Sequence, residues 1–155
     1  MDAADRTYLV VVDDTPESRV AMRFAALRAS HVGARVCLLH TMPATEFIQW
    51  GGVQDLIEAE AKDKADALLA SVADELFVLS GQRPGMIVRQ GEATTAVLET
   101  LTADPSIKAL VLGAARKGAP GPLVTYFAGE HAGTLPCLVM IIPGGLDDTR
   151  LADLT

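Results

Sequence analysis

The sequence is poor in cysteine and in basic charge, and it has no long hydrophobic segment. No apolar run approaches the roughly 18 to 20 residues that a membrane-spanning helix needs. The first six residues, Met1 to Arg6, are acidic on balance and no long apolar segment follows them, which is unlike a secretory signal. We therefore expect a cytoplasmic protein that has no membrane as a partner.

The chain has only two cysteines, and both lie in apolar surroundings. Cys37 is flanked by Val36 and Leu38, and an apolar run follows Cys137. No second cysteine stands near either one at the spacing of metal ligands. We interpret both as buried thiols and expect no metal site.

Acidic residues outnumber basic ones, 20 to 13, and the formal net charge is −7. This balance argues against nucleic acid or an anionic membrane surface as the main partner. It does not exclude a small anion, because a local cluster of hydrogen-bond donors can still hold a phosphate.

Five short apolar runs predict β-strands. The runs are nearly continuous in Val, Leu, Ile and Met, which is typical of strands covered on both faces rather than half-exposed ones. They are Tyr8 to Val12, Arg35 to Leu39, Gly85 to Arg89, Lys108 to Leu112 and Cys137 to Ile142.

Helical periodicity fills the intervals between these runs. The predicted helices are Glu17 to Ser30, Glu58 to Leu79, Ala93 to Thr102 and Pro122 to about Gly133. Strands that alternate with helices predict an α/β fold: a single doubly wound, five-stranded, mostly parallel sheet with helices on both faces. At 155 residues the chain is sized for one domain, residues 1–155.

Two segments stand outside this alternation. Residues 43–56 form a long connection that contains Trp50, and we interpret it as a surface flap or lid. Residues 144–155 are expected to form a turn that leads into a short acidic tail.

Two turns are the best candidates for a ligand site. Ligands of open parallel sheets lie beyond the carboxyl ends of the strands, where the strand order reverses. The first candidate is Asp13-Asp14-Thr15, and the second is the loop from Gly113 to Gly121, whose three glycines let main-chain amides approach an anion. Arg116 and Lys117 add positive charge there. Alternatively, the glycines merely form a turn and both cations are solvated.

Catalytic signatures are missing from the chain. It has no Gly-x-x-x-x-Gly-Lys-Ser/Thr loop and no Gly-x-Gly-x-x-Gly turn. His31, His40 and His131 are dispersed, and no nucleophile stands beside a base. We assign no catalytic residue and expect a protein that is not an enzyme, with weak ATPase activity left open.

The first strand and its turn, Leu9 to Ser18, resemble the acidic pocket of a response-regulator receiver domain. That family also needs an Asp at the end of the third strand and a Lys after the fifth. The third run and the two residues after it, Gln90-Gly91, contain no Asp, and no Lys follows Lys117, so this interpretation is the weaker one.

The universal stress protein family is the better resemblance, and it covers nearly the whole chain. The matching pieces, in order, are Val11 to Ser18, Leu38 to Pro43, Arg89 to Ala93, Leu110 to Gly113 and Leu135 to Pro143. The resemblance implies strand order 3-2-1-4-5 and a homodimer paired through the fifth strand. It also implies that Asp13 and Thr41 lie near an adenine base, and that a glycine-rich stretch from Gly113 holds ribose and phosphates.

The candidate nucleotide-binding residues combine the two turns with these family positions. They are Val12, Asp13, Thr15, Thr41, Leu112, Gly113, Arg116, Lys117, Gly118 and Gly121.

The phosphate stretch departs from the family pattern. ATP-binding members show Gly-x-x-Gly, nine residues, then Gly-Ser or Gly-Thr. From Gly113 the later pair falls at Tyr126-Phe127, and from Gly118 it falls at His131-Ala132, so neither register completes the motif. ATP or AMP remains the expected cofactor, with AMP or another short adenosine species demanding less of this stretch.

Three functions therefore stay open. The first is a stress-response binding or regulatory protein that binds an adenine nucleotide without efficient turnover. The second is a ligand-free dimeric adaptor, and the third is an ATP-binding switch with slow hydrolysis.

Overall fold

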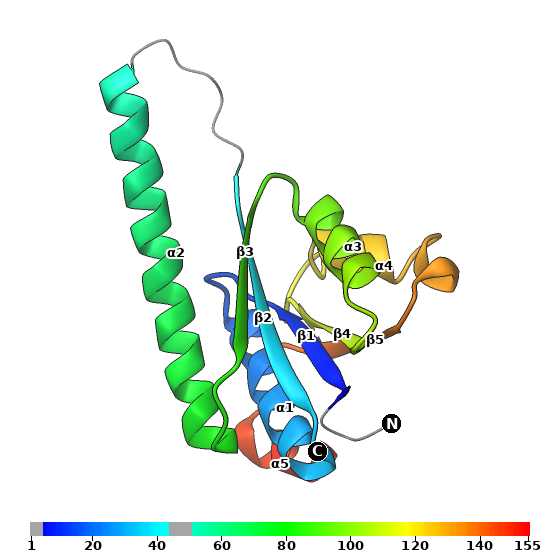
Figure 1. Cartoon of the computed structure of the whole chain (residues 1–155). Helices are drawn as coiled ribbons and strands as arrows, with labels where there is room; N and C mark the ends of the chain where they lie inside the picture. The colour runs from blue at the N-terminus through cyan, green and yellow to red at the C-terminus, as the bar shows by residue number, and fades with distance from the viewer. Residues whose placement is uncertain (1–4, 44–50) are drawn as a thin grey trace.

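The structure is a computed structural model that describes residues 5–43 and 51–155. Strands and helices alternate along it (Figure 1). In chain order the elements are β1 (Thr7–Val11), α1 (Pro16–Val32), β2 (Arg35–Met42), α2 (Gly51–Ser80), β3 (Gly85–Gln90), α3 (Ala93–Ala103), β4 (Ile107–Ala114), α4 (Pro122–Phe127), the 3-10 helix η2 (Ala132–Thr134), β5 (Leu138–Pro143) and α5 (Asp148–Leu154).

The strands form one sheet in the order β3-β2-β1-β4-β5, and each neighbouring pair is parallel. This confirms the predicted α/β class and the order 3-2-1-4-5. Strands β2 and β3 are added on one side of β1, and β4 and β5 on its other side. The carboxyl ends of β1 and β4 therefore form the switch point of the sheet. A receiver domain has the order 2-1-3-4-5, so the topology rules out that interpretation.

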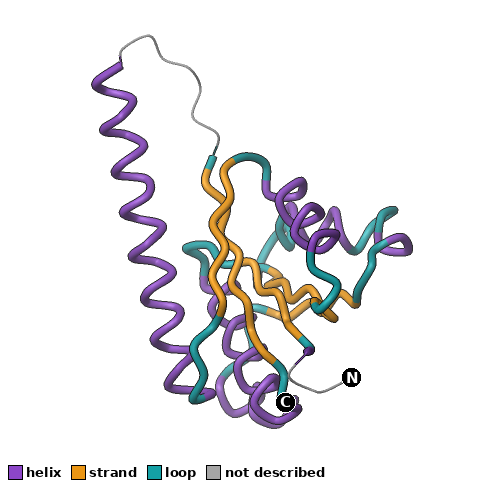
Figure 2. The backbone as a smooth tube through the Cα atoms, in the orientation of Figure 1, coloured by secondary structure: helices purple, strands orange, loops and turns teal. Residues whose placement is uncertain are grey.

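Helices cover both faces of the sheet. Figure 2 shows α1, α2 and α5 on one side and α3 and α4 on the other. Successive residues of β1 point to opposite faces. Val10 and Val12 pack in the core under α1 and α2, whereas Leu9 and Val11 pack in the core under α3 and α4. Burial on both faces explains why the strand sequences are almost continuously apolar.

Helix α1 extends the predicted segment Glu17 to Ser30 by one residue at its start and two at its end. The Thr15 hydroxyl caps the first turn by accepting the Ser18 N–H, and Pro16 occupies the first helical position. Gly33 ends the helix with φ of 72°, the left-handed conformation that glycine adopts without strain.

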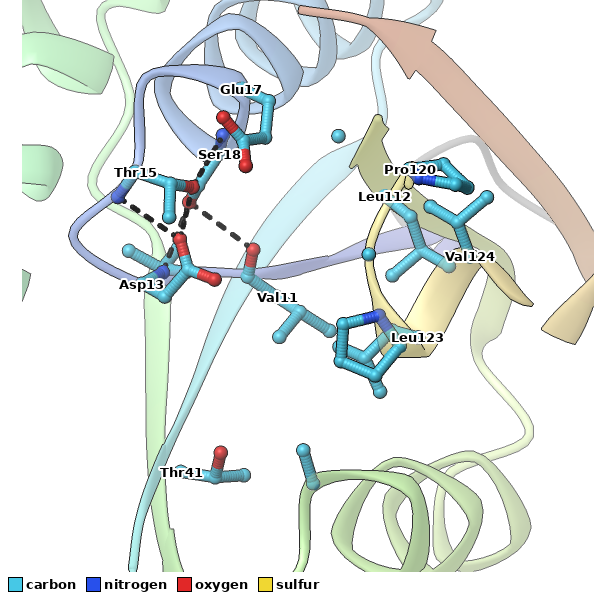
Figure 3. Close-up of a pocket in the computed structure, with 15 residues that line it drawn as sticks. Val11, Asp13, Thr15, Glu17, Ser18, Thr41, Leu112, Pro120, Leu123 and Val124 are labelled. Carbon is cyan, nitrogen blue, oxygen red and sulfur yellow. Dashed lines mark hydrogen bonds between the residues drawn. The ribbon is translucent and has the colours of Figure 1, made fainter. Parts of the chain in front are cut away.

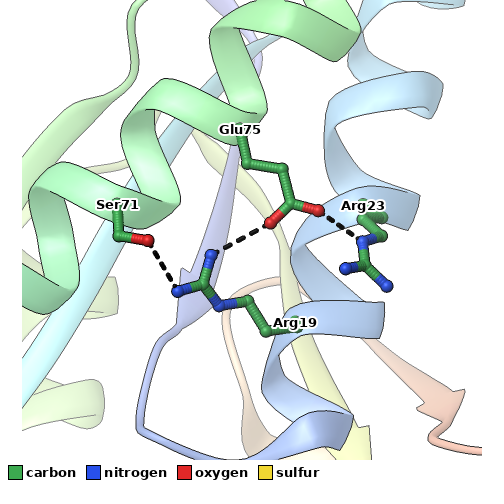
Figure 4. A network of polar contacts seen from close by, with 4 residues as sticks. All are labelled: Arg19, Arg23, Ser71 and Glu75. Atoms are coloured by element: carbon green, nitrogen blue, oxygen red, sulfur yellow. Dashed lines mark hydrogen bonds and ion pairs between the residues drawn. The ribbon is translucent and has the colours of Figure 1, made fainter.

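A polar network joins α1 to α2 (Figure 4). Glu75 accepts from Arg19 at 2.9 Å and from Arg23 at 2.5 Å, and Arg19 also donates to the Ser71 hydroxyl. The network fixes the two helices against each other beside the core residues Val72 and Leu76 of α2.

Three predicted segments differ from the structure. Helix α4 ends at Phe127, not near Gly133, because two glycines with poor helix propensity follow and the chain continues through η2. Of the predicted flap 43–56, residues 44–50 lie outside the described residues and residues 51–56 begin α2. The acidic tail contains helix α5, whose Leu151 is 1% exposed.

Helix α2 is the longest helix of the described chain, and it is buried only along its C-terminal half. Its first turns, which include Leu56 and Ile57, are exposed and stand beyond the sheet (Figure 1). No helix in the described part is long and apolar enough to cross a membrane.

Candidate functional site

A pocket of about 250 Å³ opens at the carboxyl ends of β1 and β4. Figure 3 shows polar residues of the turn after β1 on one wall, apolar residues of β4 and α4 on the other, and Thr41 at one end. The lining residues are Val11, Val12, Asp13, Thr15, Glu17, Ser18, Thr41, Ala93, Leu112, Gly113, Pro120, Gly121, Pro122, Leu123 and Val124.

Hydrogen bonds hold the polar wall in shape. The Asp13 carboxylate accepts from the Thr15 N–H at 3.1 Å and from the Thr15 hydroxyl. The buried Ser18 hydroxyl accepts the Asp13 N–H at 3.0 Å and donates to the Val11 carbonyl at 3.4 Å. These contacts link the end of β1 to the first turn of α1. They fix the main chain that carries the Asp13 side chain.

The carboxyl end of β2 closes one end of the pocket. Thr41 is half-buried and lines the pocket. The preceding residue, His40, places its ring Nδ1 2.7 Å from the Val12 carbonyl oxygen. Because an acceptor oxygen requires a donor, Nδ1 carries the proton in this contact. His40 therefore ties β2 to the residue that follows β1, at the edge of the pocket.

Gly113 lets the first turn of α1 approach the end of β4. A Cβ added at residue 113 would lie 2.2 Å from the Glu17 carbonyl oxygen. A Cβ at Gly144, after β5, would lie 2.8 Å from the Glu17 Cβ and 2.7 Å from the Ala114 carbonyl oxygen. Both glycines are needed because three main-chain segments meet at Glu17.

The loop after β4 is closed on itself. The Ala115 N–H donates to the Pro120 carbonyl at 3.0 Å, and Gly118 and Gly121 adopt φ of 75° and 123°. Arg116 is exposed and its aliphatic part lies against the turn after β5, since a Cβ at Gly145 would be 3.4 Å from its Cγ and Cδ.

The structure thus brings most of the candidate residues together but leaves three outside the pocket wall. Val12, Asp13, Thr15, Thr41, Leu112, Gly113 and Gly121 line the pocket. Arg116, Lys117 and Gly118 do not line it, and all three are exposed.

Several lining residues were missed by sequence reasoning. Glu17 and Ser18 follow the turn that was selected, and Ala93 follows the glycine-bearing turn after β3, so chain position gave a signal for these three. Leu123 and Val124 gave none, because an apolar residue at the start of a helix is indistinguishable from core.

The charge of the pocket is negative. Asp13 and Glu17 are acidic, and within the described part of the chain no basic residue lines it. The described residues also contain no group of three His, Cys, Asp or Glu side chains that could hold a metal ion. An apolar wall facing a few directional polar groups suits a flat, largely uncharged organic ligand.

A second, more open hollow of about 720 Å³ lies beside the first and shares Thr41 with it. It is bounded by the end of β2 and by α2, with Arg19, His40 and Lys64 among its lining residues.

Fold and site together define a doubly wound α/β protein with a small-ligand pocket at its switch point. A model of the universal stress protein family matches residues 6–143. The chain belongs to the universal stress protein family. A search of curated protein sequences returned no match.

Solved structures with the same fold agree with this assignment. Universal stress protein UspA from Lactobacillus plantarum is 20% identical, with TM-score 0.70, over 91% of this chain and 99% of that one. An AMP-bound family member from Arabidopsis thaliana is 18% identical, with TM-score 0.62, over 89% and 91%. The Archaeoglobus fulgidus protein in complex with dAMP is 18% identical, with TM-score 0.60, over 88% and 97%.

Proposed function

We propose that this chain is a stress-response regulatory protein that binds an adenine nucleoside or nucleotide in the pocket at the ends of β1 and β4, without efficient turnover. The observation that carries the proposal is the pocket itself. It lies at the topological switch point, and its lining contains Asp13, Thr41 and Gly113, the three positions that the family resemblance associates with the ligand.

The structural relatives support the chemical class of the ligand. One family member was solved with AMP, one with dAMP and another with cAMP. Each of these ligands carries an adenine base and a single phosphate, and the base presents a flat apolar face. The wall of Leu112, Leu123 and Val124 offers a matching apolar surface.

The size of the pocket favours a short ligand. At about 250 Å³ it lies just below the usual range of small-molecule sites, which begins at roughly 300 Å³. A single nucleoside fits such a space better than a dinucleotide does.

The lining also supports binding without turnover. Its titratable side chains in the described chain are Asp13 and Glu17, and Asp13 already accepts two hydrogen bonds from Thr15. Phosphoryl transfer is driven mainly by cations that stabilise the developing charge. Arg116 and Lys117 would have to supply that charge, and they lie outside the wall.

Filling the pocket tests the proposal. Ala93 lines the pocket at the start of α3, and Ala103 is exposed at the other end of the same helix. Calorimetric titration should show that AMP or adenosine binds the wild type and Ala103→Phe equally, whereas Ala93→Phe weakens binding at least about tenfold, or 1.4 kcal/mol. Equal binding by both variants would place the ligand elsewhere, and no binding by the wild type would refute the function.

We also propose that two copies pair through β5. This strand is one edge of the sheet, and its Leu138 and Ile141 are 68% and 40% exposed. An apolar edge strand of this kind is a template for association. Light scattering should give a dimer mass that Leu138→Lys converts to a monomer. Met86→Lys on the opposite edge, where Met86 is 56% exposed, should leave the dimer intact. A monomeric wild type, or dissociation by Met86→Lys alone, would overturn this pairing.

A further inference from the structure

We infer that Glu17 selects against phosphate charge, so that the pocket binds adenosine more tightly than ATP. This inference rests on the proposed adenine site and specifies its ligand.

The main chain and Cβ of Glu17 are fixed by close packing at one end of the pocket. They are wedged against Gly113 and Gly144, where any side chain would collide with them. Figure 3 shows the Glu17 side chain at the end of the pocket opposite Thr41, on the wall that Thr15 and Ser18 share. A base near Thr41 therefore directs the ribose and its substituents toward Glu17.

No lining cation offsets this carboxylate in the described chain. Asp13 adds a second negative charge on the same wall. Arg116 packs against Gly145, and Lys117 is exposed outside the lining. The protein as a whole carries a net charge of −7, so its long-range field repels anions as well.

The N-terminus of α1 is also a poor phosphate seat. Pro16 has no N–H to donate, and the Ser18 N–H is already bound to the Thr15 hydroxyl. Glu17 itself lies in the first turn, where its charge offsets the helix dipole. Pro16, Thr15 and Glu17 therefore weaken the features that usually attract a phosphate to a helix start.

Paired titrations test this selectivity. Dissociation constants for adenosine, AMP, ADP and ATP would be measured by calorimetry in EDTA, so that Mg²⁺ does not mask phosphate charge. The variants are Glu17→Gln, which keeps the side-chain shape, and Asp14→Asn, which removes the same charge from an exposed neighbour outside this pocket's lining. The ratio of ATP to adenosine dissociation constants cancels any general effect on stability.

The wild-type ratio should exceed about ten, and Glu17→Gln should lower it about fivefold, the size of one charge interaction at short range in a partly solvated site. Asp14→Asn should lower it less than twofold, and raising the salt concentration should lower the wild-type ratio. An unchanged ratio in Glu17→Gln, or an equal drop in Asp14→Asn, would overturn the inference while leaving the adenine site standing. If adenosine and all three nucleotides fail to bind the wild type, the proposed function itself fails.

Discussion

Gly113 and Glu17 are in such close contact that a Cβ on residue 113 would lie 2.2 Å from the Glu17 carbonyl oxygen. The obstructing atom belongs to the main chain at the start of α1 and cannot rotate away. This contact joins the end of β4 to the first turn of α1, and both sides of it line the pocket. The glycine in this turn therefore has a packing role whether or not a ligand is present.

Gly113→Ala should lower the free energy of unfolding by about 3 kcal/mol, the upper end of the cost of overpacking. Gly133→Ala is the matched control, because a Cβ there meets nothing within 4 Å. It should change stability by no more than about 0.5 kcal/mol. Urea denaturation measures both. Equal stabilities for the two variants would show that β4 and α1 are not in this contact.

Ser18→Ala should destabilise the fold by about 1–2 kcal/mol, because it leaves the Asp13 N–H without its buried acceptor. Thr102→Ala removes a hydroxyl that bonds to the Leu98 carbonyl on an exposed face of α3. That control should cost less than about 0.5 kcal/mol. If the ligand occupies the proposed pocket, Ser18→Ala should also weaken adenosine binding, since the Asp13 turn is no longer held. Full stability in Ser18→Ala would mean that the hydroxyl network does not hold the turn.

Leu151→Ala should cost about 2–5 kcal/mol, because this side chain of α5 is 1% exposed and packs in the core under α1. Leu154→Ala, on the same helix, removes a side chain that is 48% exposed and should have little effect. Thermal unfolding of the two variants distinguishes a packed helix from an accessory tail. Similar melting temperatures would contradict the packed helix.

The Cys37 thiol should react slowly at neutral pH. Burial raises its pKa above the ordinary value, and the nearby Asp104 carboxylate raises it further, so the unreactive protonated form predominates at pH 7. The raised pKa contributes stability that is present below the unfolded-state pKa and is lost as pH rises through the folded-state pKa.

Iodoacetamide labelling at increasing pH measures this effect. Asp104→Asn should shift the Cys37 labelling profile to lower pH, because it removes the charge but keeps the oxygen that accepts from Ser106. Cys137 serves as the internal control, since its pKa is raised by burial without a contribution from Asp104. A Cys37 profile that matches a free thiol would show that the site is more open than the structure indicates.

Much of the fold could be predicted from local sequence. The strands are continuous apolar runs because both faces of the sheet are covered, and Gly33 and Gly81 mark helix ends by their positive φ. The order of the strands came from the family resemblance. Helix α5 could not be predicted, because seven residues with one buried side chain give no periodic signal.

The sequence predicted which turns meet at the pocket, but not which side chains of those turns line it. Asp13 follows β1 and Thr41 lies near the carboxyl end of β2, so topology alone brings them to one edge of the sheet. Arg116 and Lys117 lie outside the wall because the Ala115–Pro120 hydrogen bond closes the loop and leaves both exposed, which spacing does not reveal. The position of Glu17 depends on the close packing at Gly113 and Gly144, which is set by tertiary structure.

The central claim is that an adenine ligand occupies the pocket between the Asp13 turn and α4. Titration of adenosine into ¹⁵N-labelled protein, followed by amide chemical shifts, tests it most directly. The account predicts saturable shifts concentrated at Val12, Asp13, Gly113 and Leu123. Shifts concentrated instead at Lys64 and Leu68, in the hollow beside α2, or the absence of shifts at millimolar adenosine, would contradict it.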